Sequence, residues 1–139
     1  LVYELHGNLQ RIVCMQCHKR YPIDIVKEQS LSSDYTLSCA SCKGLLKPDV
    51  VLFGEMLPQD VLARATQEAN SCDFLMVIGS SLFVYPAAYL PLYAKRAGAK
   101  IAIINMGETQ QDGIADVRVD APAGEVMSKI LERVKAISM

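Results

Sequence analysis

Short apolar runs alternate with helix-like segments in the second part of this 139-residue chain. The runs predict strands at Phe74–Ile78, Lys100–Ile104 and Val117–Val119. The first run stands between Asp73 and Gly79, as is typical of a parallel strand covered on both faces. A further buried strand is predicted at residues 49–53, closed by Gly54.

Three segments have the apolar period of an α-helix. The first covers residues 57–70, and the second covers residues 86–97 and ends at Gly98, a good carboxyl-terminal cap. Pro91 predicts a late start or a kink in the second helix, because proline disrupts a helix interior. The third helix is predicted at about residues 123–134. The apolar faces of the first and third helices consist of Leu57, Val61, Leu62, Ala65 and Ala69, and of Val126, Met127, Ile130, Leu131 and Val134.

The order of strand, helix, strand, helix, strand, helix predicts an α/β fold. Such an order favours a parallel sheet with right-handed crossovers, here half of a doubly wound, Rossmann-like sheet. The strand Phe74–Ile78 is apolar enough to be central, yet it lacks an obvious neighbour, and an unpaired central strand promotes aggregation. The chain also begins at Leu1 rather than at a methionine. We therefore expect it to be the back half of a larger protein.

Composition restricts the possible partners. The chain is 51% hydrophobic and 21% charged, and its 14 basic and 15 acidic residues give a net charge of -1. This balance argues against binding to nucleic acid or to a membrane surface through bulk charge. The longest apolar runs are also too short to span a bilayer.

Four of the five cysteines follow the spacing C-x2-C-x21-C-x2-C, which is typical of a zinc ribbon. Two such pairs supply the four thiolates of a closed structural zinc site: Cys14, Cys17, Cys39 and Cys42. The segment 21–37 between them is polar and rich in serine, so we expect it to have little core and to fold only with zinc. Cys72 precedes an apolar strand and is interpreted as a small core residue.

Two other interpretations of the cysteines are open. Two disulfides would need an oxidising compartment, which nothing in the sequence indicates. The segment from Cys14 to His18 also spells C-x-x-C-H, the attachment pattern of haem c, but that reading leaves Cys39 and Cys42 unexplained. Zinc is therefore favoured, with a cytoplasmic location.

Two loops after predicted strands could bind a nucleotide. Gly79, Ser80 and Ser81 offer a close backbone approach, N–H groups and hydroxyls to phosphate oxygens. Asn105, followed by Met106 and Gly107, could bond ribose hydroxyls. Taken alone, the first loop favours an ordinary turn over phosphate binding, and the second is equally compatible with a turn. The chain has neither G-x-G-x-x-G nor a P-loop.

The chain resembles the sirtuins, which are NAD-dependent protein lysine deacylases, through five motifs in the same order. These are ELHGN at 4–8, the two cysteine pairs, KPDVVLFGEMLP at 47–58, IGSSLFVYPA at 78–87 and INMG at 104–107. Two further motifs of the family, Gly-Ala-Gly-x-Ser and Gln-Asn-x-Asp, are absent. The resemblance implies the carboxyl-terminal half of an NAD-binding domain at 1–12 and 44–139, with a zinc-ribbon module at 13–43.

The resemblance also implies a role for each motif. His6 would be the general base, because an imidazole can accept a ribose hydroxyl proton near neutral pH. The acyl oxygen of the modified lysine would attack the nicotinamide ribose and release nicotinamide. NAD would contact Gly79, Ser80, Ser81, Asn105, Met106, Gly107 and Ala123. The zinc would be structural.

An acylated-lysine peptide would pair with two chain segments as an added strand. Its acyl-lysine would enter an apolar tunnel, which favours a neutral side chain. The substrate residues implied are Val51, Phe53, Gly54, Glu55, Met56, Phe83, Val84 and Tyr85.

The 139 residues alone are expected to be weakly active or inactive, because the amino-terminal half of the domain would be missing. A non-catalytic zinc-ribbon binding module is the alternative. An assay of nicotinamide release from NAD in the presence of an acetyl-lysine peptide distinguishes the deacylase from the binding module.

Overall fold

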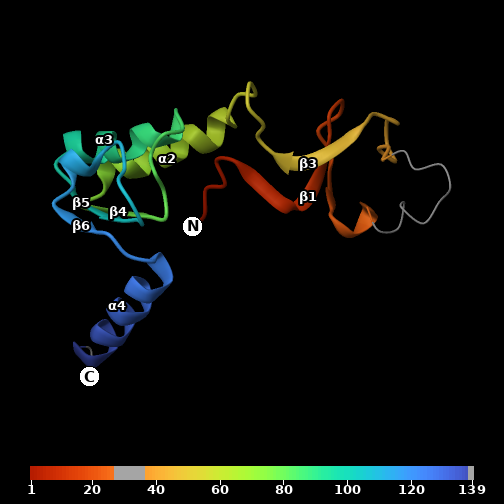
Figure 1. The fold of residues 1–139 in the computed structure, drawn as a ribbon. Helices are drawn as coiled ribbons and strands as arrows, with labels where there is room; N and C mark the ends of the chain where they lie inside the picture. Colours follow the sequence, from red (N-terminus) through yellow and green to blue (C-terminus); the bar gives the residue numbers. More distant parts are fainter. Residues whose placement is uncertain (27–36, 138–139) are drawn as a thin grey trace. The chain divides into compact units, whose positions relative to one another are not determined.

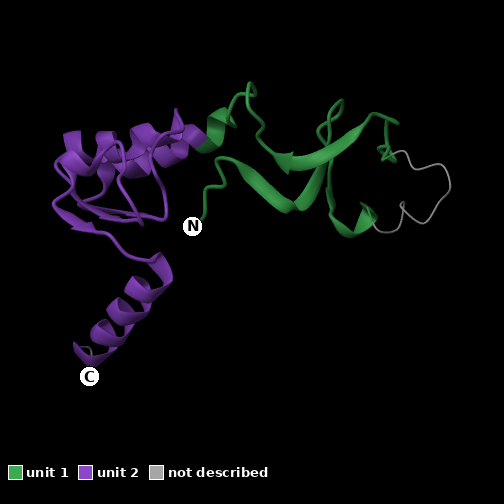
Figure 2. Cartoon of the chain, in the orientation of Figure 1, with its two compact units in different colours: residues 1–61 green, residues 62–139 purple. Residues whose placement is uncertain are grey.

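The computed structural model describes residues 1–26 and 37–137, which form two compact units. Figure 2 shows unit 1, residues 1–61, in green and unit 2, residues 62–139, in purple. The described helices are all too short or too polar to traverse a lipid bilayer.

Unit 1 contains an antiparallel sheet of three strands in the order β2-β1-β3. Figure 1 labels two of them, β1 and β3. The strands are β1 (Gly7–Cys14), β2 (Arg20–Pro22) and β3 (Leu46–Val50). The buried cluster beside them contains two of the predicted metal ligands, because Cys14 and Cys39 are fully buried together with Ile12 and Leu46. The packing of this unit and the geometry of its cysteines are therefore linked.

The segment between the cysteine pairs contributes more apolar packing than expected. Its described ends pack against the buried cluster through Tyr21, Ile23, Ile25, Val26 and Leu37. Residues 27–36, which include three of the serines behind that expectation, lie outside the described residues.

The strand predicted at residues 49–53 was placed wrongly. The observed strand is β3, which pairs antiparallel with β1 and takes no part in the parallel sheet. Residues 51–53 follow the strand, and Phe53 is 99% exposed. An apolar run indicates burial only where a partner covers it, and a turn after Val51 leaves this run uncovered within unit 1.

Unit 2 is built on a parallel sheet, as the sequence predicted. Strands β4 (Phe74–Ile78), β5 (Lys100–Ile104) and β6 (Val117–Val119) lie in the order β4-β5-β6. Ile101 and Ile103 of β5 are fully buried and pack with alanines of α2 (Gln59–Ser71) and α3 (Leu90–Arg96). Cys72 packs against the same core, as predicted. The α/β class with a parallel sheet is confirmed.

One prediction for unit 2 needs correction. Phe74 and Ile78 are 49% and 43% exposed, so β4 is not covered on both faces, and among the described residues it pairs only with β5. The predicted last helix is confirmed as α4 (Ala123–Ile137), and it contains no buried residue.

The second predicted helix is confirmed with the expected late start. A single 3-10 turn, η1 (Ala87–Tyr89), precedes α3, and Pro91 lies in the first turn of α3, where its missing N–H is tolerated. Gly98 has a positive φ, and its N–H donates to Lys95 O, as in a glycine cap at the carboxyl end of a helix. A second 3-10 turn, η2 (Asp112–Ile114), precedes β6.

Candidate functional site

His6 is exposed at the end of a tight turn that leads into β1. The Gly7 N–H donates to Glu4 O at 3.2 Å, and the Val51 N–H donates to His6 O at 3.0 Å. The Glu4 carboxylate accepts from Asn8 Nδ2 at 2.6 Å and Arg11 Nη2 at 2.5 Å. These bonds from Asn8 and Arg11 lower the pKa of Glu4. The turn therefore holds the backbone of His6 on both sides while its side chain faces solvent.

Gly7 allows this turn to approach β3 closely. It has a φ of +76°, and a Cβ atom there would lie 1.9 Å from Asp49 O. Any other residue would push β1 and β3 apart directly beside His6. Gly44 is similarly restricted, because its Cβ would lie 2.9 Å from Gln16 side-chain atoms and 3.1 Å from Cys14 Sγ.

The substrate segment predicted at residues 51–56 forms an exposed turn closed by Glu55. The Leu52 N–H donates to Glu55 Oε2 at 3.0 Å, and Lys47 Nζ donates to the same oxygen at 2.5 Å. The bond from Lys47 lowers the pKa of Glu55. Phe53 and Met56 are left 99% and 81% exposed. Lys47 was not predicted as a site residue, because the sequence shows only a basic residue eight positions before Glu55.

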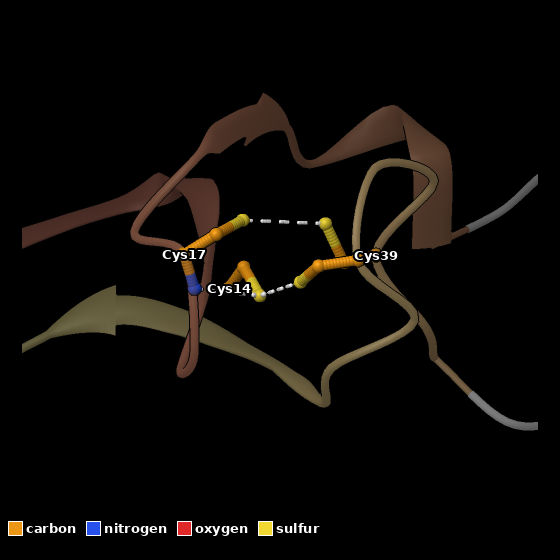
Figure 3. A group of neighbouring side chains, drawn as sticks. Cys14, Cys17 and Cys39 are labelled. Atoms are coloured by element: carbon orange, nitrogen blue, oxygen red, sulfur yellow. Dashed lines mark hydrogen bonds between the residues drawn. The ribbon is translucent and has the colours of Figure 1, made fainter.

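The four predicted metal ligands meet in one cluster. Their sulfur atoms all lie within 4.8 Å of one another, and none forms a disulfide. Cys14 Sγ is 3.4 Å from Cys42 Sγ, and Cys17 Sγ is 3.6 Å from Cys39 Sγ. Figure 3 shows the side chains of Cys17 and Cys39 directed toward each other. Sulfurs about 2.3 Å from a central zinc would be separated by about 3.8 Å in a tetrahedron. The arrangement fits tetrahedral zinc.

Hydrogen-bond donors surround these thiols. The N–H groups of Gln16 and Cys17 each lie 3.4 Å from Cys14 Sγ and lower its pKa. The Tyr21 hydroxyl lies 3.1 Å from Cys39 Sγ and lowers the pKa of Cys39 to about 5. Such donors stabilise thiolates, the form that binds zinc.

Cys42 differs from the other thiols. The Gly44 N–H lowers its pKa, but the neighbouring thiols of Cys14 and Cys17 raise it, and the net result is about 12. Four thiolates in contact repel one another, so their full ionisation requires a cation, and zinc supplies that charge.

The two predicted nucleotide loops lie side by side at the carboxyl edge of the parallel sheet. Ile78 and Ile104 are paired in register, and the Gly79 N–H donates to Ile104 O at 2.9 Å. The Gly79 loop and the Asn105 loop therefore begin at adjacent strand ends. This edge is where open α/β sheets bind their ligands.

The polar groups of the first loop face outward. Ser80 and Ser81 are exposed, and Gly79 has a φ of +63° with open space where a Cβ would lie. The Ser80 hydroxyl accepts from the Leu82 N–H at 3.3 Å. Beyond this turn the predicted substrate residues Phe83, Val84 and Tyr85 are 58%, 51% and 45% exposed.

The second loop is held by residues to which the sequence analysis gave no role. Asp120 Oδ1 accepts from the Gly107 N–H at 2.9 Å, and Arg118 bonds carbonyl oxygens of the loop. The only indication of this role in the sequence is that Arg118 lies between two valines in a short predicted strand. Met106 at the tip is 68% exposed, and Ala123, the last predicted NAD contact, begins α4.

The predicted site residues are thus divided between the units. His6 and the segment 51–56 belong to unit 1, whereas both nucleotide loops and residues 83–85 belong to unit 2. Within unit 1, the backbones of His6 and Val51 are hydrogen-bonded. Within unit 2, the sheet brings the nucleotide loops together.

Comparison with known proteins gave consistent matches. Residues 1–86 match the model of the Sir2 family. The chain is 47% identical over 137 residues to an NAD-dependent protein deacylase 2 from Archaeoglobus fulgidus, covering 98% of this chain and 54% of that protein. It is 42% identical over 131 residues to an NAD-dependent protein deacetylase from Thermotoga maritima, covering 94% and 53%.

Solved structures gave the same result. A structure of Sir2 bound to acetylated peptide superposes with a TM-score of 0.89 at 40% identity, covering 96% of this chain and 56% of that chain. A structure of Sir2 with p53 peptide and NAD+ gives a TM-score of 0.88 at 40% identity, covering 97% and 56%. The chain therefore spans about half the length of the relatives it matches.

Proposed function

Because the chain belongs to the Sir2 family, we propose that the protein containing it is an NAD-dependent protein lysine deacylase. Its substrates would be NAD and an acylated-lysine protein or peptide. NAD would supply the ribose carbon that takes the acyl oxygen and releases nicotinamide. The 139 residues alone would have little or no activity, since their relatives are nearly twice as long.

We assign the catalytic role to His6. Its exposed imidazole would accept the proton of a ribose hydroxyl, and the turn held by Glu4 and Gly7 would keep its backbone in place. The Gly79–Ser80–Ser81 and Asn105–Met106–Gly107 loops, with Ala123, would contact NAD. Val51, Phe53, Gly54, Glu55, Met56, Phe83, Val84 and Tyr85 would contact the acyl-lysine peptide.

One observation carries the NAD assignment. Gly79 and Asn105 follow paired residues of adjacent parallel strands, so the hydroxyls of the exposed Ser80 and Ser81 and the side-chain amide of Asn105 gather at one edge of the sheet. Phosphate and ribose need such donors and acceptors within a short distance of each other.

The zinc cluster would have a structural role only. All four ligands would be cysteine thiolates, which is the closed coordination of a structural site: Cys14, Cys17, Cys39 and Cys42. We also propose that residues 13–43 act as a zinc-ribbon module and that the amino-terminal half of the NAD domain is the main partner of residues 1–12 and 44–139. The proposal includes a cytoplasmic location without nucleic-acid or membrane partners.

The test is nicotinamide release from NAD by the full-length protein with an acetyl-lysine peptide. We expect His6→Ala to lower kcat by about a hundredfold or more, as loss of a general base does. His18→Ala is the matched control, because His18 is the other histidine, and it lies between the cysteine pairs rather than at the proposed site. Full activity of His6→Ala would overturn the catalytic assignment. No wild-type turnover, with zinc bound, would favour the non-catalytic binding module.

A further inference from the structure

We propose that Arg118 is a positioning residue that holds the 105–109 loop in the shape needed to bind a ribose of NAD. The inference rests on the proposed function, because it deepens the assignment of that loop to NAD. Arg118 lies on β6 and reaches back to the loop that follows β5.

The guanidinium of Arg118 bonds backbone carbonyls on both sides of the loop. Nη1 donates to Asn105 O at 3.0 Å and to Val119 O at 2.6 Å, and Nη2 donates to Gly107 O. The carbonyls of Asn105 and Gly107 stand two residues apart, so one rigid group fixes the direction of both peptide planes. Met106 is left at the exposed tip between them.

The remaining nitrogen of Arg118 is anchored by Asp112. Nε donates to Asp112 Oδ1 at 2.9 Å, and the same carboxylate accepts from the Thr109 hydroxyl at 2.6 Å and the Thr109 N–H at 3.2 Å. Thr109 is buried. The bonds from Thr109 and Arg118 lower the pKa of Asp112, so its carboxylate stays charged. The far end of the loop is thereby tied to the same guanidinium.

These contacts determine which loop atoms are available to a ligand. Asn105 Nδ2 donates to Met106 O at 2.9 Å and Gly107 O at 3.2 Å, and the Gly107 N–H is taken by Asp120. Asn105 Oδ1 accepts no hydrogen bond from the described part of the chain. A free amide oxygen accepts hydroxyl protons, which a ribose diol supplies.

Lysine cannot replace this arginine. Arg118 uses three nitrogens in a planar fork to reach four acceptors, whereas a lysine ammonium is a single donor atom on a flexible stem. An Arg118→Lys variant keeps the charge and loses the bonding pattern. A loss of NAD affinity in this variant would therefore come from the changed loop geometry and not from a lost positive charge.

The experiment compares full-length wild type with Arg118→Lys and with Arg96→Lys. Arg96 is an exposed arginine at the end of α3 that serves as the matched control. We expect Arg118→Lys to raise the Kd and KM for NAD about tenfold and to change kcat by less than about twofold, because it loosens binding rather than chemistry. Hydrogen exchange should quicken at the backbone amides of residues 105–109 and stay unchanged in β4 and β5.

The outcomes separate the inference from the proposed function. If wild type binds no NAD, the proposed function fails and the inference falls with it. If wild type binds NAD and Arg118→Lys binds equally well, or loses kcat at unchanged KM, the inference alone is overturned. Should Arg118→Lys unfold, Asp112→Asn provides the test, since it keeps Arg118 and removes its anchoring charge. We then expect a smaller rise in the Kd, and no rise would overturn the inference.

Discussion

Tyr21 shows how single side chains around the cysteines contribute to metal binding. Its hydroxyl lies 3.1 Å from Cys39 Sγ, and Lys19 Nζ lies 5.7 Å from the centroid of its ring. The O–H dipole of Tyr21 is directed at the Cys39 thiolate, and a lysine cation lies over the same ring. Partners of this kind orient metal ligands and offset their charge.

Replacing Tyr21 with phenylalanine should therefore weaken zinc binding. The ring that packs in the cluster is kept, and only the donor to Cys39 is lost. We expect the zinc affinity to fall about tenfold, measured by competition with a chromogenic chelator. Tyr89→Phe, which removes a hydroxyl from a stacked ring in unit 2, is the control. Equal affinity of wild type and Tyr21→Phe would show that this hydrogen bond does not support the metal.

At the scale of elements, one carboxylate joins three neighbours in unit 2. Asp116, just before β6, accepts from Lys95 Nζ at 2.7 Å, from the Ile101 N–H at 2.9 Å and from Lys100 Nζ at 3.1 Å. These groups belong to α3 and β5. The bonds from Lys95, Ile101 and Lys100 hold the pKa of Asp116 well below its usual range.

The depressed pKa makes part of the stability depend on pH. The charged Asp116 stabilises the fold fully above the ordinary aspartate pKa of about 3.9, and this contribution is lost as the pH falls towards the lower folded pKa. We expect Asp116→Asn to lower the free energy of unfolding at pH 7, and the difference from wild type to shrink below about pH 4. Urea unfolding at several pH values measures this. Asp73→Asn, at an exposed aspartate, should lack the trend, and a pH-independent difference for Asp116→Asn would contradict the prediction.

The elements were predictable where the local pattern and the tertiary contacts agree. β5 is apolar in sequence and buried in the structure, so its bounds were correct. The run at residues 50–53 has the same local pattern, but only Val50 belongs to a strand, because β1 pairs with the polar Lys47 and Asp49 upstream. Strand pairing depends on residues forty positions away, which periodicity does not report.

At the scale of the whole molecule, each unit has its own buried cluster. The cluster of unit 1 includes the metal ligands Cys14 and Cys39, whereas that of unit 2 is formed by aliphatic residues around Ile101 and Ile103. Only the first cluster needs a metal to neutralise its thiolates. The two units should therefore respond differently to zinc removal.

Chelation should unfold unit 1 and leave unit 2 folded. Structural zinc contributes about 10–16 kcal/mol of binding free energy in small zinc domains, so its loss removes most of the stability of such a unit. We expect the amides of Ile12 and Cys14 to lose protection from hydrogen exchange after chelator treatment. The amides of Ile101 and Ile103 should keep theirs. Protection of β1 in a protein shown by metal analysis to be zinc-free would contradict this.

The candidate site was predictable to the extent that its chemistry lies in short motifs. The four cysteines have a diagnostic spacing and do form one cluster. Arg118 and Asp120 have no such spacing, since they act on the 105–107 loop from the next strand. A supporting residue of this kind becomes apparent only when the fold places it beside the motif that it holds.

The two crowded glycines imply an uneven tolerance of substitution along the chain. A side chain at Gly7 or Gly44 would collide with backbone or ligand atoms, whereas Gly54, Gly79, Gly98 and Gly107 face open space. Both crowded positions lie in unit 1, beside the His6 turn and the zinc cluster. Natural variation and directed evolution should therefore have little freedom at these two codons. The open glycines all have a positive φ, so an ordinary L residue there would meet backbone strain rather than a collision.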